Sequence, residues 1–434
     1  MSGSKKNVGP LPRAVIVLGW VSFFTDASAD MIYPLVPAFL VSLGGGATAL
    51  GWLEGVAEAV SAGIKLWAGR AIDKAQHPKR FVVLGYGISA LSRPLYALAS
   101  APVHAVIVRV ADRVGKGLRG PPRDALLAAA VSPEQRGHAF GYHRMMDNFG
   151  GVAGPILAFL ALKIAELPLR QVFLWSVVPG LVSVLIAQVF LKGGAIEERV
   201  NETAPGKGEL GKDGKVEGKV DGKVEGAGEP SQDKKVDESV NGKVSEKGAI
   251  QVLPWRFLVV TGVFTLSASG DLFLMRRLTD LGMHVAYVPM AWVSLQLAKG
   301  LFNVPGGRAS DRYGRRKVLA AAWALYALTY VAFGLVNVWW AAWALLLPYA
   351  LHYGLAEGGQ RALLTDLTPK EVRGRAFGVM LAMEGVLILP ANVGFGMITD
   401  KIGSKEAFFA AGGFAALAAL LLGMLVREKQ PAPT

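Results

Sequence analysis

Long apolar stretches separated by short polar turns run through most of the chain. Segments such as AFFAAGGFAALAALLLGMLV are long enough, as helices, to cross a hydrocarbon layer about 30 Å thick. Breaking the chain at its polar turns predicts twelve such helices, six on each side of a hydrophilic insert. The expected spans are roughly 14–43, 47–71, 80–99, 103–124, 138–166 and 168–193, then 254–282, 286–309, 317–338, 340–366, 374–399 and 405–427.

The hydrophilic insert divides the chain into two halves. It contains GKDGKVEGKVDGKVEGAGEPSQDKK, a low-complexity run of Gly-Lys-Val-acid units without aromatic residues, which is typical of a disordered linker. A regulatory or lipid-surface segment is the alternative. We expect an N-terminal six-helix bundle over roughly 14–193, a cytoplasmic linker over 194–253 and a C-terminal six-helix bundle over 254–427. Short cytoplasmic termini, 1–13 and 428–434, flank them.

Composition and charge support a multi-pass membrane protein. The chain is 52% hydrophobic and 18% charged, too apolar for a soluble domain of 434 residues. Its net charge of +13 is concentrated in alternate loops such as DRYGRRK and TPKEVRGR, whereas LGGGATALG and SAPVHA carry no lysine or arginine. This pattern predicts that the basic loops and both termini face the cytoplasm. The protein is expected in the plasma (inner) membrane, in contact with its lipid. We expect no nucleic-acid partner, because the positive charge is explained by membrane topology.

Several kinds of site find no support in the sequence. No cysteine is present, so disulfides and thiolate metal sites are excluded. No nucleophile-base triad, HExxH or Walker A motif is visible, and histidines number six. We therefore expect no enzyme, catalytic residue, metal or cofactor, and a monomer. Because MSGSKKNVGPLPR leads into a long apolar segment without a cleavage site, the first span is expected to remain as an anchor.

The two halves repeat one another. GRAID at 69–73 returns as GRASD at 307–311, and DALLAAAVSPEQRGHAFG at 124–141 returns as RALLTDLTPKEVRGRAFG at 361–378. The displacement is roughly 237 residues in each case, apart from a one-residue slip. Matching register, beyond matching composition, predicts two pseudo-symmetric bundles of common origin.

On these motifs the chain resembles the major facilitator superfamily over essentially its whole length outside the insert. The family signature after the second helix of a half appears fully as GRASDRYGRRK, with Gly307, Asp311, Arg312, Gly314 and Arg315. The first half keeps Gly69 and Asp73 but has AQHPK at the central turn. An acid beside bases at a cytoplasmic helix end can latch one bundle to the other, and plain topology marking is the alternative.

A second family signature lies on the fifth span. Gly150, Gly154 and Pro155 form Gly-x-x-x-Gly-Pro, which the resemblance associates with efflux antiporters. Glycines four apart permit close helix approach, and Pro155 removes a backbone donor and bends the helix. Ordinary small-residue packing would use the same spacing.

Ionisable residues inside the spans mark a pathway or a paired site, because each costs about 2.5–3.5 kcal/mol to insert. Pairs four residues apart share one helix face in the first and second spans. The fourth span carries a charged stripe in RVADRVGKGLRGPPRDALL, which must face the bundle interior. The predicted proton-coupling and substrate-pathway residues are Asp26, Asp30, Glu54, Glu58, Arg109, Asp112, Arg113, Asp147, Asp271 and Glu384.

Three expectations concern the fourth span in detail. Asp112 is spaced to pair with Arg109 and Lys116. Pro121-Pro122 is expected to end or kink the helix, which would leave Arg119 and Arg123 at the cytoplasmic boundary. The resemblance implies an arginine on this helix that is linked to proton transfer; both Arg109 and Arg113 fit the family pattern, and the choice stays open.

The sequence favours a proton-coupled exporter of a small organic solute that works by alternating access. Asp26 and Asp30 would exchange protons, and a nearby Arg109 or Arg113 would favour their ionised forms. An uptake symporter for an organic anion, suggested by the basic fourth span, is the first alternative. A static salt-bridge network and a non-transporting receptor are the others.

Overall fold

The computed structural model describes residues 11–72, 78–132, 135–191, 253–369 and 372–426. The first half contains α1 (Arg13–Ile32), η1 (Tyr33–Leu35), α2 (Val36–Ser42), α3 (Ala47–Ile72), α4 (Pro78–Ser92), η2 (Arg93–Leu98), α5 (Pro102–Ala129), α6 (Arg136–Lys163), α7 (Leu169–Trp175) and α8 (Val177–Phe190). The second half contains α11 (Trp255–Ser267), α12 (Asp271–Asp280), η5 (Val285–Tyr287), α13 (Val288–Tyr313), α14 (Arg315–Leu335), α15 (Trp339–Ala344), α16 (Leu346–Leu367), α17 (Arg373–Lys401) and α18 (Ser404–Leu425). The expected linker and termini lie almost entirely outside the described residues.

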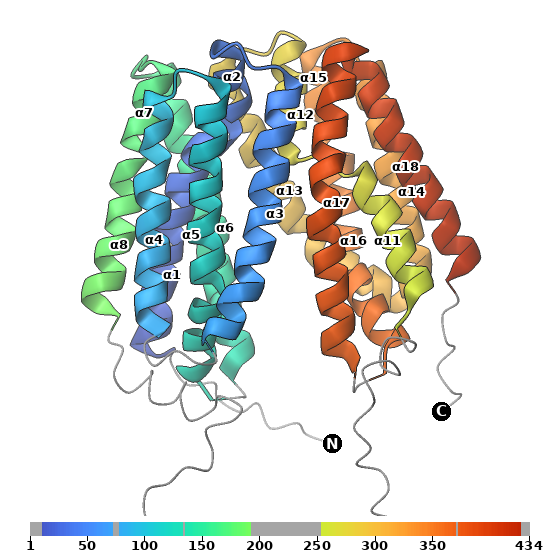
Figure 1. The fold of residues 1–434 in the computed structure, drawn as a ribbon, viewed down its shortest axis with the longest axis horizontal. Helices are drawn as coiled ribbons and strands as arrows, with labels where there is room; N and C mark the ends of the chain where they lie inside the picture. Colours follow the sequence, from blue (N-terminus) through green and yellow to red (C-terminus); the bar gives the residue numbers. More distant parts are fainter. Residues whose placement is uncertain (1–10, 73–77, 133–134, 192–252, 370–371, 427–434) are drawn as a thin grey trace, which may run out of the picture.

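Each expected span coincides with one long helix or with consecutive helical elements. The first span is α1, η1 and α2, interrupted near Pro34 and Pro37, and α4 passes into η2 at Pro94. Proline causes such breaks because it has no backbone N–H to donate. The result is an all-α membrane protein with twelve transmembrane segments in two six-helix bundles, which Figure 1 shows side by side.

The described helices differ in how apolar they are. Nine helical segments of the described chain are long and apolar enough to span a membrane by composition alone. The other three spans are α3, α5 and the pair α15 and α16, which carry more polar side chains. A polar span must turn its charges away from lipid.

Helix α5 is longer than the sequence predicted. It continues through Pro121 and Pro122 and ends at Ala129, so of the two expected effects, an end or a kink, the end is wrong. Each proline removes one backbone donor, but the following turn holds Leu126 and Leu127 fully buried in the apolar core of the first half. Tertiary burial therefore outweighs the local loss of hydrogen bonds.

The apolar core is shared at one end of the molecule and divided at the other. One cluster joins residues of both halves, for example Phe39 and Leu40 with Leu278 and Met283. Two further clusters each belong to one half, around Leu126 in the first and Leu363 in the second. We call the shared end, where α3 begins and α17 ends, the closed end, and the opposite end, where α5 and α13 end, the open end. Figure 1 shows α3 and α17 approaching at the closed end and diverging below it.

Small residues bring α3 and α17 into backbone contact. A side chain at Gly51 would collide with the carbonyl of Asn392, and one at Gly396 would collide with the carbonyl of Ala47. Glycine permits this approach because it has no Cβ. The two halves can therefore pack closely along one helix pair without interlocking long side chains.

Asp400 fastens the closed end. Its Oδ1 accepts a hydrogen bond from the Ala47 backbone N–H at 2.8 Å, and its Oδ2 accepts one from Thr48 at 2.7 Å. These N–H groups open the first turn of α3, where no helical carbonyl is available to them. A carboxylate from the second half thus caps the helix of the first, and the positive end of the helix dipole favours it.

Replacing Asp400 with alanine should populate conformations in which the closed end has opened. Loss of the cap is worth about 1 kcal/mol, or roughly a fivefold shift in a two-state population. Because the chain has no cysteine, spin labels at Ser100→Cys and Val338→Cys can report the separation by pulsed electron paramagnetic resonance. Asp400→Ala should add a longer distance, whereas Asp280→Ala, which removes a carboxylate paired within its own helix, should not. Identical distance distributions would contradict the fastening role.

Candidate functional site

A cavity of about 1130 Å³ lies between the two halves. On α5 its lining runs from Arg109 to Asp124, which is about 22 Å along the helix axis and leads toward the open end. The second half contributes residues of α12, α13 and α16, from Asp271 to Arg361. Tyr33 and Trp292, which line the cavity from the two halves, meet edge to face with ring centroids 5.1 Å apart. The cavity is therefore a pocket of one open end and one closed end.

Charged side chains dominate the lining. Nine basic and six acidic residues line the cavity, so the lining is basic even with every acid ionised. The acids are Asp26, Asp30, Asp112, Asp124, Asp147 and Asp271. The bases are Arg109, Arg113, Lys116, Arg119 and Arg123 from α5, with Lys65, Arg93, Arg144 and Arg361 from other helices. The predicted charged face of the fourth span does line the bundle interior.

Asp112 is held by a residue that the sequence reasoning missed. Arg93, on η2, contacts Asp112 Oδ1 through Nε and Nη2, both at 3.0 Å, and its Nη1 donates to the Thr25 carbonyl at 2.9 Å. Arg109 lies at 3.8 Å from the second oxygen, as its spacing suggests, whereas the expected pairing with Lys116 does not form. An arginine directly before Pro94 in an apolar span was the available signal for this partner.

The two arginines considered for the family role each bind a glutamate of α3. Arg109 contacts Glu54 Oε1 through Nε at 3.1 Å and Nη2 at 3.0 Å, and Tyr33 donates its hydroxyl to the other oxygen at 2.6 Å. The Arg109 guanidinium also lies over the Tyr33 ring, 4.1 Å from its centroid. Arg113 pairs with Glu58 at 2.9 Å. Two glutamates of α3 therefore neutralise two arginines of α5.

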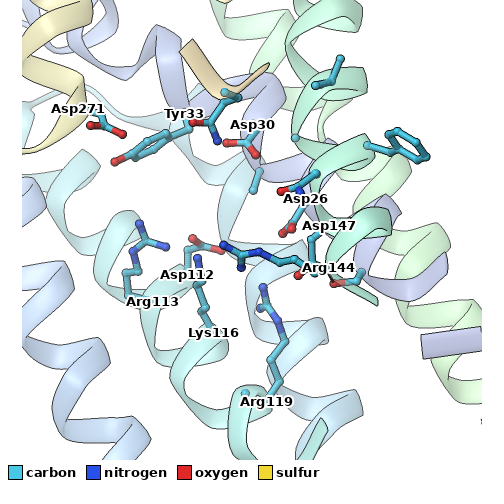
Figure 2. Close-up of a pocket in the computed structure, with 18 of the residues that line it drawn as sticks. Asp26, Asp30, Tyr33, Asp112, Arg113, Lys116, Arg119, Arg144, Asp147 and Asp271 are labelled. Atoms are coloured by element: carbon cyan, nitrogen blue, oxygen red, sulfur yellow. Dashed lines mark hydrogen bonds between the residues drawn. The ribbon is translucent and has the colours of Figure 1, made fainter. Parts of the chain in front are cut away.

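Asp26 and Asp30 are placed differently. Both line the cavity, and among the residues that the structure describes neither has a basic nitrogen within 4.0 Å. Asp30 Oδ2 faces Gly151 of α6, where an added Cβ would lie 3.1 Å away. Figure 2 shows both carboxyl groups on the cavity wall above the basic residues of α5. The expected close arginine is absent here, because Arg109 and Arg113 turn toward Glu54 and Glu58.

The remaining acids on the predicted pathway have partners. Asp147 accepts from the Ser22 hydroxyl and lies 3.5 Å from His143 Nδ1. Asp271 contacts Lys299 Nζ at 2.5 Å and accepts from the Tyr349 hydroxyl at 2.6 Å.

Glu384, the repeat equivalent of Asp147, lies apart from this cavity. It accepts from Gln360 Nε2 at 2.8 Å and is not among the lining residues. The repeat therefore preserves the position of an acid without preserving its surroundings.

Arg119 differs from its expected place at the cytoplasmic boundary, and the boundary role of Arg123 stays a prediction. Arg119 is buried, donates to the Ser89 hydroxyl at 2.6 Å and lies over the Tyr86 ring. Arg123 binds the neighbouring Asp124 at 2.8 Å. Because α5 continues beyond both prolines, these arginines stay within the helical part of the bundle.

The signature motifs take up local packing and turn positions. Asp73 lies outside the described residues, and Gly69 is the fourth residue from the end of α3. Gly314 has φ +92° between α13 and α14, a conformation that favours glycine. Arg315 contacts Asp366 at 2.6 Å and Asp311 at 3.8 Å, so these contacts join helices of the second half. Arg312 lies over the Tyr313 ring.

The glycines of the second signature hold α6 against α1. A Cβ at Gly150 would collide with the Phe23 carbonyl, and one at Gly154 with the Ala27 carbonyl. Pro155 lies inside α6, which continues to Lys163. The spacing therefore serves close packing of α6 against α1, the helix that carries Asp26 and Asp30.

Replacing Asp112 with asparagine should lower the free energy of unfolding by about 3 kcal/mol, since it leaves the buried Arg93 charge without its counter-ion. Both side chains are nearly inaccessible, at 3% and 6%. Thermal unfolding of the purified protein in detergent measures the change. Asp311→Asn, at a side chain 74% exposed, should change stability by less than about 1 kcal/mol. Equal effects of the two substitutions would contradict the structural importance of the Arg93 pair.

Sequence and structure comparisons agree with this architecture. The family model described as Major Facilitator Superfamily matches residues 18–276 and 256–434. An uncharacterized MFS-type transporter of Methanocaldococcus jannaschii is 27% identical over 435 residues, covering 96% of each chain. The multidrug resistance protein MdtH of Photorhabdus laumondii is 29% identical over 128 residues, covering 29% of this chain and 32% of that protein.

Among solved structures, a bacterial homologue of the human lysosomal transporter Spinster, in an inward-facing and unoccupied conformation, superposes with a TM-score of 0.71. It is 14% identical, and the match covers 96% of this chain and 97% of that one. At this identity the likeness establishes the fold. Together with the family model, which matches both halves, it shows that the chain is a membrane transporter of the major facilitator superfamily.

Proposed function

We propose that the chain is a proton-coupled secondary transporter that moves a small organic solute by alternating access. The observation that carries the proposal is the pair Asp26 and Asp30, which face a cavity between the two halves and have no basic partner within 4.0 Å in the described part of the chain. A carboxyl group without a fixed counter-ion can gain and lose a proton with little rearrangement of its neighbours. The other carboxylates of the cavity are tied into ion pairs or hydrogen bonds.

The surroundings of these carboxyls suit coupling. The charged groups around Asp26 and Asp30 are Arg93 of η2, Lys116, Arg119 and Arg109 of α5, and Asp147 of α6. Protonation of either aspartate changes the balance of charge in the solute cavity itself. Proton occupancy and solute binding must then influence each other reciprocally.

Alternating access needs the closed end to open and the open end to close. The glycine contacts of α3 with α17 and the Asp400 cap would break in that transition, while each half keeps its own apolar cluster. We take the open end, which carries the basic loops, as cytoplasmic, with both termini on that side in the plasma membrane. The Arg315 cluster would then be positioned to latch the halves when the open end closes.

Export by proton antiport is the first candidate for the coupling. It is supported by the partial likeness to the multidrug resistance protein MdtH and by the Gly-Pro signature of α6. The second candidate is uptake of an organic anion together with protons, which the basic excess of the cavity lining favours. In both candidates a single chain provides the whole cavity, as a monomer within the lipid bilayer.

Asp26→Asn and Asp30→Asn should each reduce transport driven by a proton gradient at least about tenfold in proteoliposomes, while counterflow without a gradient persists. Asparagine keeps the size of the side chain and cannot exchange a proton. Asp124→Asn, which removes a cavity acid bound to Arg123, provides the matched control and should keep gradient-driven transport. If both asparagine variants drive transport as the native chain does, Asp26 and Asp30 do not carry the coupling.

The direction of solute movement under an acid-outside gradient separates the two candidates whichever way the protein inserts. Antiport should expel preloaded solute from proteoliposomes, and symport should concentrate added solute inside them. A protonophore should abolish either movement. Solutes for this assay come from a thermal-shift screen of purified protein with organic anions, cations and neutral compounds. Movement that ignores both the gradient and the protonophore would contradict proton coupling.

A further inference from the structure

The cations of the cavity fall into two groups according to whether a carboxylate neutralises them. Arg93, Arg109, Arg113 and Arg123 each contact an acid between 2.8 and 3.0 Å. Lys65 and Arg119 have no acidic oxygen within 4.0 Å among the described residues, but Arg119 is buried and donates to the Ser89 hydroxyl. Lys116 of α5 and Arg144 of α6 likewise have no acidic oxygen within 4.0 Å among the described residues, and neither is buried. Figure 2 shows both side chains extending toward the middle of the cavity. Two cations on neighbouring walls are therefore available to a ligand.

The opposite wall has a different character. On α13 the cavity is lined by Trp292, Leu297, Gly300 and Leu301, with Gln296 as a neutral polar residue among them. Leu297 and Leu301 are 50% and 74% exposed, although they line a cavity in a charged protein interior. Asp271, the acid that the second half contributes to the lining, is already bound by Lys299 and Tyr349. The α13 residues that line the cavity thus offer a largely apolar surface and carry no charge.

We propose that the cavity binds an amphipathic organic anion, whose carboxylate, sulfonate or phosphate group contacts Lys116 and Arg144 and whose aromatic or alkyl body packs on Trp292, Leu297 and Leu301. Arginine and lysine donate charge-assisted hydrogen bonds to such groups, and apolar area on the other wall adds affinity. The inference rests on the proposed function in that this cavity is the solute site, and it belongs with the second candidate.

A cationic ligand fits the same cavity less well. It would rely on Asp26 and Asp30, but four lining bases, Lys65, Lys116, Arg119 and Arg144, have no ion partner in the described part of the chain, against these two acids. Moreover, every other acid in the lining except Asp147 is already paired with an arginine or lysine, and Asp147 is held by Ser22 and His143. A cationic ligand would have to approach Lys116 and Arg144, whose positive charges no carboxylate of the described residues neutralises.

Binding of three aromatic probes of one size tests the sign of charge. 2-Naphthalenesulfonate, 2-naphthol and 2-naphthylmethylammonium share the ring and differ in charge, and the sulfonate stays ionised at every working pH. Titration calorimetry with the full chain in detergent should show the sulfonate binding at least about tenfold more tightly than the other two. Equal affinities, or preference for the ammonium, would overturn the proposal.

Substitutions then locate the site. Lys116→Gln and Arg144→Gln should each weaken sulfonate binding about tenfold, and Lys116→Arg, which keeps the charge, should retain it. Lys163→Gln removes the same charge from the far end of α6, outside the cavity lining, and should leave affinity unchanged. Leu301→Gln should weaken the sulfonate and leave inorganic sulfate binding unaltered, because the apolar wall acts on the ring alone. If neither Lys116→Gln nor Arg144→Gln alters affinity in folded protein, the assigned contacts are wrong.

Failure of this inference and failure of the proposed function give different results. Calorimetry in detergent needs no proton gradient, so sulfonate binding that depends on Lys116 would stand even if proteoliposomes showed no proton-driven flux. Conversely, proton-driven flux that depends on Asp30, together with binding of the ammonium probe alone, would support the proposed transport function and contradict the proposal that the solute is an anion.

Discussion

Buried ion pairs between α5 and its neighbours determine what the cavity can do. A helix with so many charges can lie in a membrane bundle only if most of them are neutralised, because an unpaired buried ion loses its hydration without compensation. Arg93 satisfies Asp112, and Glu54 and Glu58 satisfy Arg109 and Arg113. Asp26, Asp30, Lys116 and Arg144 line the cavity without an ion pair among the described residues, and in the proposed function these are the groups that meet protons and solute.

Much of this arrangement was within reach of the sequence. Span number, the two halves and the inward charged face of α5 follow from apolar length, register and helical periodicity, which are properties of one segment at a time. The partners across helices were harder to foresee. Asp112 has correctly spaced basic residues on its own helix, yet its shortest ion pair is with Arg93 of η2. The packing of the helices, and not the spacing along one helix, decides which guanidinium lies beside the carboxylate.

Two errors have the same origin. The double proline was expected to end or kink α5, and it does not end the helix; Arg119 was expected at the boundary, because local rules treat each helix alone. In the structure Leu126 and Leu127 are buried after the prolines, and Arg119 meets Ser89 of α4. Asp400 illustrates a third limit: it lies just past the expected end of its span, and its value as a cap appears only when α3 of the other half is placed beside it. The predicted pathway roles themselves stay predictions until transport is measured.

The charge of the solute and the sign of the coupling are a single physical question in this cavity. A cation would compete with protons for Asp26 and Asp30, so binding of one would expel the other, which is the thermodynamics of antiport. An anion held by Lys116 and Arg144 would gain when the two carboxyls lose their negative charge, so anion and protons would bind together, which is the thermodynamics of symport. Because the apolar wall of α13 acts equally on either ligand, it cannot decide between them. If the proposed function holds, the unpaired charges of the first half would set both specificity and coupling, while the apolar wall of the second half would enclose the ligand.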